Sequence, residues 1–129
     1  MKLWLDDVRD PDEHRYNVEH RLEGFVWVTS YDEAIEVLKT GKVVYASLDH
    51  DLGLLSCKEC RQSAGSYEKW SEIQDHGCIH GEKTGYNVIC WMEENNVWPR
   101  EGVRVHSANP AGKDRMLQVI RKIYGRDFQ

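Results

Sequence analysis

Three short apolar segments in this chain are each followed at once by acidic, histidine or amide side chains. The segments and the side chains after them are residues 2–5 with Asp6 and Asp7, residues 43–48 with Asp49, His50 and Asp51, and residues 102–105 with His106, Ser107 and Asn109. Near-continuous apolar runs of this length are typical of strands covered on both faces. Because parallel strands end along one edge of a sheet, the pattern predicts that these polar side chains converge there.

Helical patterns alternate with the apolar segments. A capping box beginning at Ser30 starts one helix, residues 84–95 form a second, and Asn109 is a good N-cap for a third. Residues 25–28 are bulky and partly β-branched, as is typical of a further strand. This order predicts an α/β fold with a parallel sheet of about four strands flanked by helices.

The size and charge of the chain limit its organisation and its partners. With 129 residues and 15.1 kDa, one domain over residues 1–129 is expected. The 22 acidic residues outnumber the 17 basic ones, and no run of Lys and Arg is present. This argues against binding to an extended nucleic acid duplex. A small phosphorylated ligand or an RNA end is compatible with this charge, if a metal or a few positioned side chains supply positive potential at the site.

The first residues and the overall hydropathy bear on the compartment. Residues 1–7 carry two carboxylates and do not fit the apolar region of a signal peptide, and no apolar run approaches about 20 residues. We therefore expect a cytoplasmic protein that does not contact the membrane. In that compartment cysteines are more often metal ligands or free thiols than disulfides.

The acidic side chains after the first and third apolar segments are candidates for a metal site. Asp6, Asp7 and Asp49 would form the oxygen-rich pocket that Mg²⁺ or another divalent cation prefers. Each carboxylate also has a structural alternative, since loop aspartates often cap turns and Asp7 could pair with Arg9. Three acids crowded at a buried strand edge are costly without a charge partner, which favours function for the set.

Two histidines follow the predicted central strands. His50 and His106 would suit a general acid and base acting on a phosphoester, although either alone is more often a packing histidine. Asp49 and Ser107 flank them and complete the expected catalytic group. Near the start of the last helix, Lys113 and Arg115 are weaker candidates for binding a phosphate.

Residues 54–83 form a polar insertion that contains three of the four cysteines. Cys57 and Cys60, followed by Cys78 and His80, have the spacing of a split zinc site, with His76 as an alternative to His80. A polar segment of this size has too little core to order itself, so a structural zinc is predicted in preference to free thiols. The insertion begins directly after the end of the third predicted strand. It is either a lid over the site or a loop without a role in the chemistry.

The segments LWLDDVR, SLDHDLG, TGYNV and HSANP together resemble the cyclic-phosphate-processing receiver-like domains. The resemblance runs from Leu3 to about Met116 and leaves out the insertion. It implies a receiver-like, flavodoxin-like fold that acts on cyclic phosphates, in cyclic nucleotides or at damaged RNA ends. The side chains expected to contact that substrate are Arg9, Asp51, Asn109, Lys113 and Arg115.

The chain matches the pattern of ordinary phosphoacceptor receivers at some positions and departs from it at others. Asp6 and Asp7 resemble the metal-binding pair, Asp49 the phosphorylated aspartate, and Ser107 the switch hydroxyl. A fifth strand ending in the usual lysine is not apparent, and the two histidines are not part of the ordinary pattern.

We therefore expect a phosphoesterase that opens a cyclic phosphate. The alternative is a noncatalytic receiver-like module that recognises a phosphorylated ligand or a protein partner. A zinc-stapled adaptor is a third reading.

Overall fold

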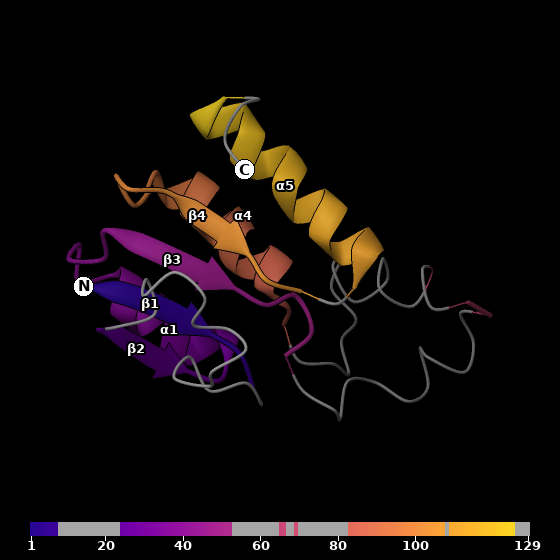
Figure 1. Ribbon diagram of the computed structural model, residues 1–129, viewed down its shortest axis with the longest axis horizontal. Helices are drawn as coiled ribbons and strands as arrows, with labels where there is room; N and C mark the ends of the chain where they lie inside the picture. The colour runs from indigo at the N-terminus through magenta and orange to yellow at the C-terminus, as the bar shows by residue number, and fades with distance from the viewer. Residues whose placement is uncertain (8–23, 53–64, 67–68, 70–82, 108, 126–129) are drawn as a thin grey trace.

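The computed structural model describes residues 1–7, 24–52, 65–66, 69, 83–107 and 109–125 (Figure 1). Its helices and strands are β1 (Lys2–Leu5), β2 (Phe25–Val28), α1 (Tyr31–Leu38), β3 (Tyr45–Leu48), α4 (Gly85–Asn95), β4 (Val103–Val105) and α5 (Pro110–Tyr124). The four strands form one parallel sheet in the order β2-β1-β3-β4. This arrangement is that of a receiver-like α/β fold, as predicted.

The predicted element boundaries agree with the structure to within two residues. Strand β3 begins at Tyr45 instead of residue 43, because Tyr45 pairs with Lys2, where β1 itself begins. Strand β4 begins at Val103, since Gly102 has a φ of 113° and cannot continue an extended ladder. The insertion at residues 54–83 falls almost entirely outside the described residues, so its zinc site and the single-domain organisation stay predictions.

Two of the helices, α1 and α5, begin at side-chain caps that the sequence indicated. Ser30 accepts a hydrogen bond from the backbone N–H of Glu33, and the Thr29 hydroxyl donates to the Glu33 carboxylate and lowers its pKa. Asn109 accepts from the backbone N–H of Gly112 at 3.1 Å and so begins α5. These bonds satisfy backbone donors that have no partner within the helix.

The three described helices pack their apolar stripes onto one face of the sheet. Their buried residues join alternate strand residues in one core, and we call this side of the sheet the helix face. The core residues are Leu3, Leu5, Val28, Ala34, Ile35, Leu38, Ala46, Leu48, Leu52, Val88, Ile89, Met92, Val103, Val105, Met116, Leu117 and Ile120. At one end of the core, burial raises the pKa of Tyr124 to about 12, and its hydroxyl donates to the Pro99 carbonyl.

The opposite side of the sheet carries aromatic residues, and we call it the aromatic face. It is formed by Trp4, Phe25, Trp27 and Tyr45, which alternate with the core residues along the strands. The rings of Trp4 and Tyr45 both meet the Phe25 ring edge to face, with centroids 5.8 and 6.0 Å away. The two faces of the sheet therefore differ in chemistry, and the described helices pack on the helix face.

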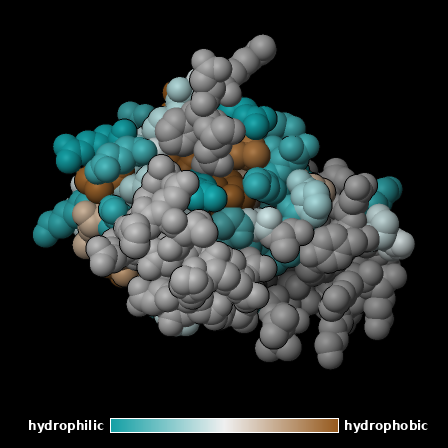
Figure 2. Space-filling model, viewed as in Figure 1, coloured by the Kyte–Doolittle hydropathy of each residue, from teal (hydrophilic) through white to brown (hydrophobic). Residues whose placement is uncertain are grey.

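Figure 2 shows the hydropathy of the described residues on one face of the molecule. The described residues that show there are mostly hydrophilic, and hydrophobic ones show only in small areas. In the part of the chain that the structure describes, none of the helices has the length and hydropathy needed to cross a lipid bilayer.

Candidate active site

Three carboxylates meet where β1 and β3 end. Asp6 follows β1 and Asp49 follows β3, and these strands are parallel neighbours in which Leu5 pairs with Leu48. One oxygen of each carboxylate, that of Asp7 included, lies within 4.8 Å of the others. The Asp6 side chain is fully buried and Asp49 is only 5 % exposed. The predicted convergence of Asp6, Asp7 and Asp49 at the carboxyl edge of the sheet is therefore observed.

The donor set of this acidic cluster fits a hard divalent cation. Carboxylate oxygens are the ligands that Mg²⁺ prefers, and their close approach concentrates negative charge that a cation would neutralise. Part of that charge is already balanced locally. The Asp49 carboxylate accepts the backbone N–H of His50 at 2.9 Å, and Asp6 contacts an imidazole. The partly exposed Asp7 side chain would provide a third oxygen ligand.

His106 is the imidazole that contacts the acidic cluster. Its Nε2 lies 3.0 Å from Asp6 Oδ2 and its Nδ1 lies 2.7 Å from the Ser47 hydroxyl. The ring also stacks on the indole of Trp4, with centroids 3.9 Å apart and planes inclined by 6°. A neutral ring can donate from Nε2 and accept from Ser47, and a charged ring can donate to both groups. The same contacts therefore accommodate His106 with one proton or with two.

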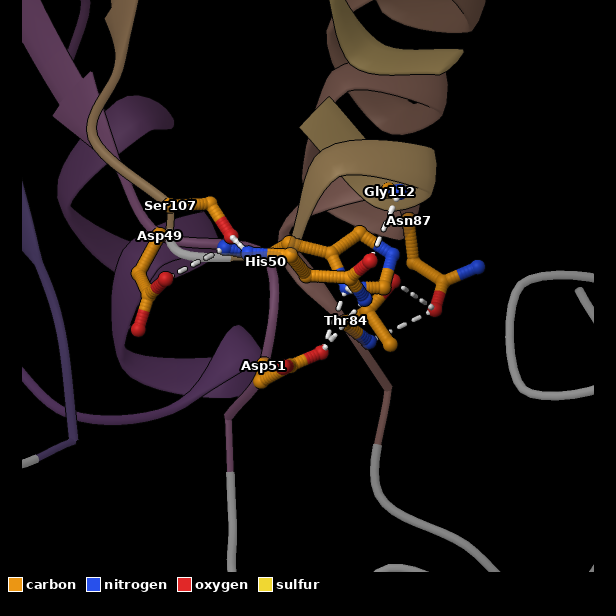
Figure 3. A network of polar contacts seen from close by, with 8 residues as sticks. Asp49, His50, Asp51, Thr84, Asn87, Ser107 and Gly112 are labelled. Atoms are coloured by element: carbon orange, nitrogen blue, oxygen red, sulfur yellow. Dashed lines mark hydrogen bonds and ion pairs between the residues drawn. The ribbon is translucent and has the colours of Figure 1, made fainter. Parts of the chain in front are cut away.

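His50 belongs to a second polar group, next to the first turn of α5 (Figure 3). Its Nδ1 lies 2.7 Å from the Asp51 carboxylate, which also accepts from the Asn109 side-chain amide at 3.1 Å. Since the Asn109 oxygen already caps α5, its nitrogen is the atom that faces Asp51 and His50. We assign the His50 Nδ1 proton to the bond with Asp51, because a bare nitrogen facing a carboxylate would be repelled.

Two glycines allow helices to approach the ends of the strands. A Cβ on Gly112 would lie 2.5 Å from atoms of the His50 ring, so only a residue without a side chain fits there. A Cβ on Gly85 would collide with the backbone carbonyl of Asp49, whereas the Gly85 N–H donates to the His50 carbonyl at 2.9 Å. Gly85 lies in the TGYNV segment that carried the family resemblance and Gly112 follows the HSANP segment by two residues, but spacing alone gave no reason to single them out.

The two histidines lie on different sides of the sheet edge. Side chains alternate along an extended chain, so Ser47 and Asp49 point to the aromatic face and His50 points to the helix face. His106 contacts Trp4 and Ser47 on the aromatic face, whereas His50 contacts Gly112 of α5. In Figure 3 the Asp49 carboxylate and the His50 ring accordingly lie on opposite sides of the backbone. The residues predicted as an acid and base pair are thus held by two separate sets of contacts.

The remaining predicted site residues are placed around these groups or fall outside the described ranges. The Ser107 hydroxyl accepts from the Asn109 backbone N–H at 3.0 Å, so it shapes the turn into α5. Lys113 and Arg115 lie in the first turns of α5 and are partly exposed. The residues outside the described ranges are Arg9, Cys57, Cys60, Cys78 and His80.

Sequence reasoning missed Ser47 and Trp4, the two side chains that hold the His106 ring. Both lie two residues before a carboxylate of the acidic cluster, Asp49 and Asp6 respectively. The alternation of side chains along a strand would have placed them on the same face as those carboxylates. A buried polar residue such as Ser47 within an apolar run was the available signal.

Comparison with known proteins gives one match. A family model described as the cyclic-phosphate processing receiver domain matches residues 1–122. No curated protein and no solved structure is significantly similar to the chain.

Proposed function

The chain belongs to the family of cyclic-phosphate processing receiver domains, and we propose that it is a phosphoesterase that opens a cyclic phosphate at the acidic cluster. The observation that carries this proposal is the meeting of three carboxylates from adjacent strand ends, with the imidazole of His106 bonded to one of them. Acids and an imidazole in contact at the carboxyl edge of a parallel sheet are suited to binding a metal and moving protons.

The acidic cluster would hold a divalent cation that offsets the negative charge of the phosphate. Asp6, Asp7 and Asp49 are the residues that would bind it, because their oxygens lie close enough to share one ion. A bound Mg²⁺ would draw a phosphate oxygen toward the cluster and stabilise charge that develops during ring opening. Without a cation the same carboxylates would repel an anionic substrate.

His106 is the group that we propose for proton transfer. In ring opening by water, the water oxygen bonds to phosphorus, one phosphorus–oxygen bond of the ring breaks, and the freed oxygen takes up a proton. A base must remove a proton from the water and an acid must supply one to the leaving oxygen. His106 would take the proton from the attacking water and return it to the leaving oxygen, so that no second proton donor is needed, while its other nitrogen keeps a partner, Ser47 or Asp6.

The mechanism expected from the sequence used His50 as the second member of the pair. His50 is 1 % exposed and packs against Gly112, which favours a positioning role over direct contact with substrate. In this role the His50 backbone N–H orients the Asp49 carboxylate, and the ring ties β3 to α5 through Asp51 and Asn109. Asp49 and His50 are then one unit, of which only the carboxylate reaches the ligand.

Other side chains would contact the substrate or stabilise the insertion. Asn109 was expected to contact the substrate, but it is 2 % exposed and its side chain is bonded to Gly112 and Asp51, so like His50 it is better placed to position the site. Ser107 lies at the turn into α5, and Lys113 and Arg115 extend this side of the site with positive charge. Arg9 and Asp51 stay proposed substrate contacts. A structural zinc at Cys57, Cys60, Cys78 and His80 also remains a proposal, which elemental analysis of protein purified without chelator tests directly.

Phosphorus NMR of a substrate panel tests the proposed activity. The panel contains 2′,3′-cyclic and 3′,5′-cyclic nucleotides and an oligoribonucleotide ending in a 2′,3′-cyclic phosphate, each with and without Mg²⁺. We expect the cyclic diester signal to be replaced by a monoester signal for at least one member, and only with the metal. If no member is opened with Mg²⁺, Mn²⁺ or Zn²⁺, the noncatalytic binding module becomes the better account.

A further inference from the structure

One tryptophan is exposed beside the acidic cluster. Trp27 lies on the edge strand β2 and is 43 % exposed, although its neighbour in register, Trp4, is only 3 % exposed. The indole N–H of Trp27 donates to the backbone carbonyl of Asp6 at 2.8 Å. A large apolar ring is thus fixed in direction, by a hydrogen bond to a residue of the site, while much of its surface faces solvent.

The Trp27 ring lies on the same face of the sheet as the proton-transferring group. Because Trp4 pairs with Trp27, both side chains point to the aromatic face. The His106 ring stacks on Trp4 and reaches the Asp6 carboxylate on that face as well. Trp27, Trp4 and His106 therefore form an aromatic row along the edge where the acidic cluster would hold a phosphate.

We propose that Trp27 is the platform on which the base of the substrate stacks, so that the substrates are nucleoside cyclic phosphates. This inference rests on the proposed function. The indole carries no charge for a phosphate and its N–H donor is already bonded to the Asp6 carbonyl, but its flat π face suits a nucleobase and tolerates any of the four bases. The bond to Asp6 sets the ring in advance, which limits the ordering cost of stacking. The base would lie on Trp27 and the phosphate at the acidic cluster, one sugar apart.

Binding and turnover of substrates with and without a base test this inference. The turnover arms use 2′,3′-cyclic AMP, an oligoribonucleotide with the same terminal group, and glycerol 1,2-cyclic phosphate, which has no base. The binding arms use adenosine 3′-monophosphate and glycerol 3-phosphate with Mg²⁺. We expect Trp27→Ala to lower the preference for base-bearing ligands about tenfold to a hundredfold, mostly through KM and Kd, as is typical of losing one stacked base. Comparing the turnover of 2′,3′-cyclic AMP with that of the oligoribonucleotide shows whether the substrate is a free nucleotide or an RNA end.

Three further variants separate stacking from folding. Trp27→Phe should keep most of the preference because it retains an aromatic face, and Trp27→Leu should lose it although it stays apolar. Val26→Ala is the matched control, because Val26 is a similarly exposed residue on the same strand that points to the other face. Val26→Ala should leave the preference for base-bearing ligands unchanged, both in turnover and in binding.

The inference is overturned if wild-type protein binds adenosine 3′-monophosphate no better than glycerol 3-phosphate, or if Trp27→Ala weakens both equally. If the nucleotide preference in binding depends on Trp27 but no cyclic phosphate is opened, stacking is supported and the proposed catalysis fails.

Discussion

At the scale of single residues, the His106 ring is held at both nitrogens and on one face. Asp6 and Ser47 lie within hydrogen-bond distance of its two nitrogens, and Trp4 stacks on one face of the ring. A group that must gain and lose a proton at a fixed place benefits from partners that suit both of its protonation states.

Replacing His106 should separate its hydrogen bonds from its proton transfer. We expect His106→Ala to lower the turnover of a cyclic phosphate by roughly two to four orders of magnitude. His106→Gln should be almost as inactive, since an amide can contact Asp6 but cannot take up a proton. Steady-state kinetics measures the loss, and far-ultraviolet circular dichroism checks that both variants fold. Turnover by His106→Gln at the wild-type rate would mean that His106 only positions Asp6.

Gly112 tests the contact between α5 and His50. Replacing a helical glycine by alanine normally stabilises a helix by up to about 1 kcal/mol. Here the added Cβ would lie 2.5 Å from the His50 ring, so we expect Gly112→Ala to destabilise the protein by about 1–3 kcal/mol instead. Urea unfolding measures the effect.

A double variant shows whether this cost comes from His50. In a His50→Ala background the added methyl group has room, so Gly112→Ala should then be neutral or stabilising. A cost of the same size in both backgrounds would show that the ring is not what Gly112 accommodates.

At the scale of elements, the start of α5 joins the last helix to the end of β3. The side-chain oxygen of Asn109 caps α5 by accepting from the Gly112 backbone N–H, and its side-chain nitrogen donates to the Asp51 carboxylate. The side chain is 2 % exposed, so neither bond is easily replaced by water. One residue thus sets both where the helix begins and how the His50 group is arranged.

Two substitutions at Asn109 distinguish these two bonds. Ser is a good N-cap but is too short to reach Asp51, whereas Ala lacks both functions. We expect both variants to be destabilised, and Asn109→Ala to be less stable than Asn109→Ser by about 1 kcal/mol. Chemical denaturation of the two variants side by side measures the difference. Equal stability would indicate that the cap contributes little and that the bond to Asp51 dominates.

At the scale of the whole molecule, local patterns in the sequence predicted the elements and the edge of the sheet where the polar residues gather. Apolar runs predicted the positions of the strands, and the caps at Ser30 and Asn109 predicted where two helices begin, because these signals depend only on neighbouring residues. They placed Asp6 and Asp49 correctly, since parallel strands end together.

The separation of the two histidines was not apparent from the sequence. Pairing His50 with His106 followed from their similar places after strands, but a shift of one residue in an extended chain reverses the side on which a side chain lies. The close approach at Gly112 and the bond from Trp27 to Asp6 depend on residues distant in sequence. Such contacts arise only when the elements pack.

The acidic cluster should limit the stability of the molecule when no metal is present. Carboxylate oxygens within 4.8 Å repel one another, so Asp49→Asn should raise Tm in the presence of a chelator. Mg²⁺ should raise the Tm of the wild type, by binding the folded state, and have little effect on the variant. A thermal shift series with Mg²⁺ measures both effects, with Asp114→Asn on exposed α5 as the control. An equal response of wild type and Asp49→Asn to Mg²⁺ would place the ion elsewhere.

The most direct test of the central claim is the turnover of 2′,3′-cyclic AMP as a function of Mg²⁺ concentration, in wild-type protein and in Asp49→Asn. The claim is that the carboxylates at the ends of β1 and β3 hold the cation on which ring opening depends. It predicts that wild-type turnover rises with Mg²⁺ to a plateau and vanishes with chelator, and that Asp49→Asn loses at least about a hundredfold in kcat/KM, as is typical of removing a main electrostatic contribution. Turnover that is independent of Mg²⁺, or equal in the two proteins, would contradict it.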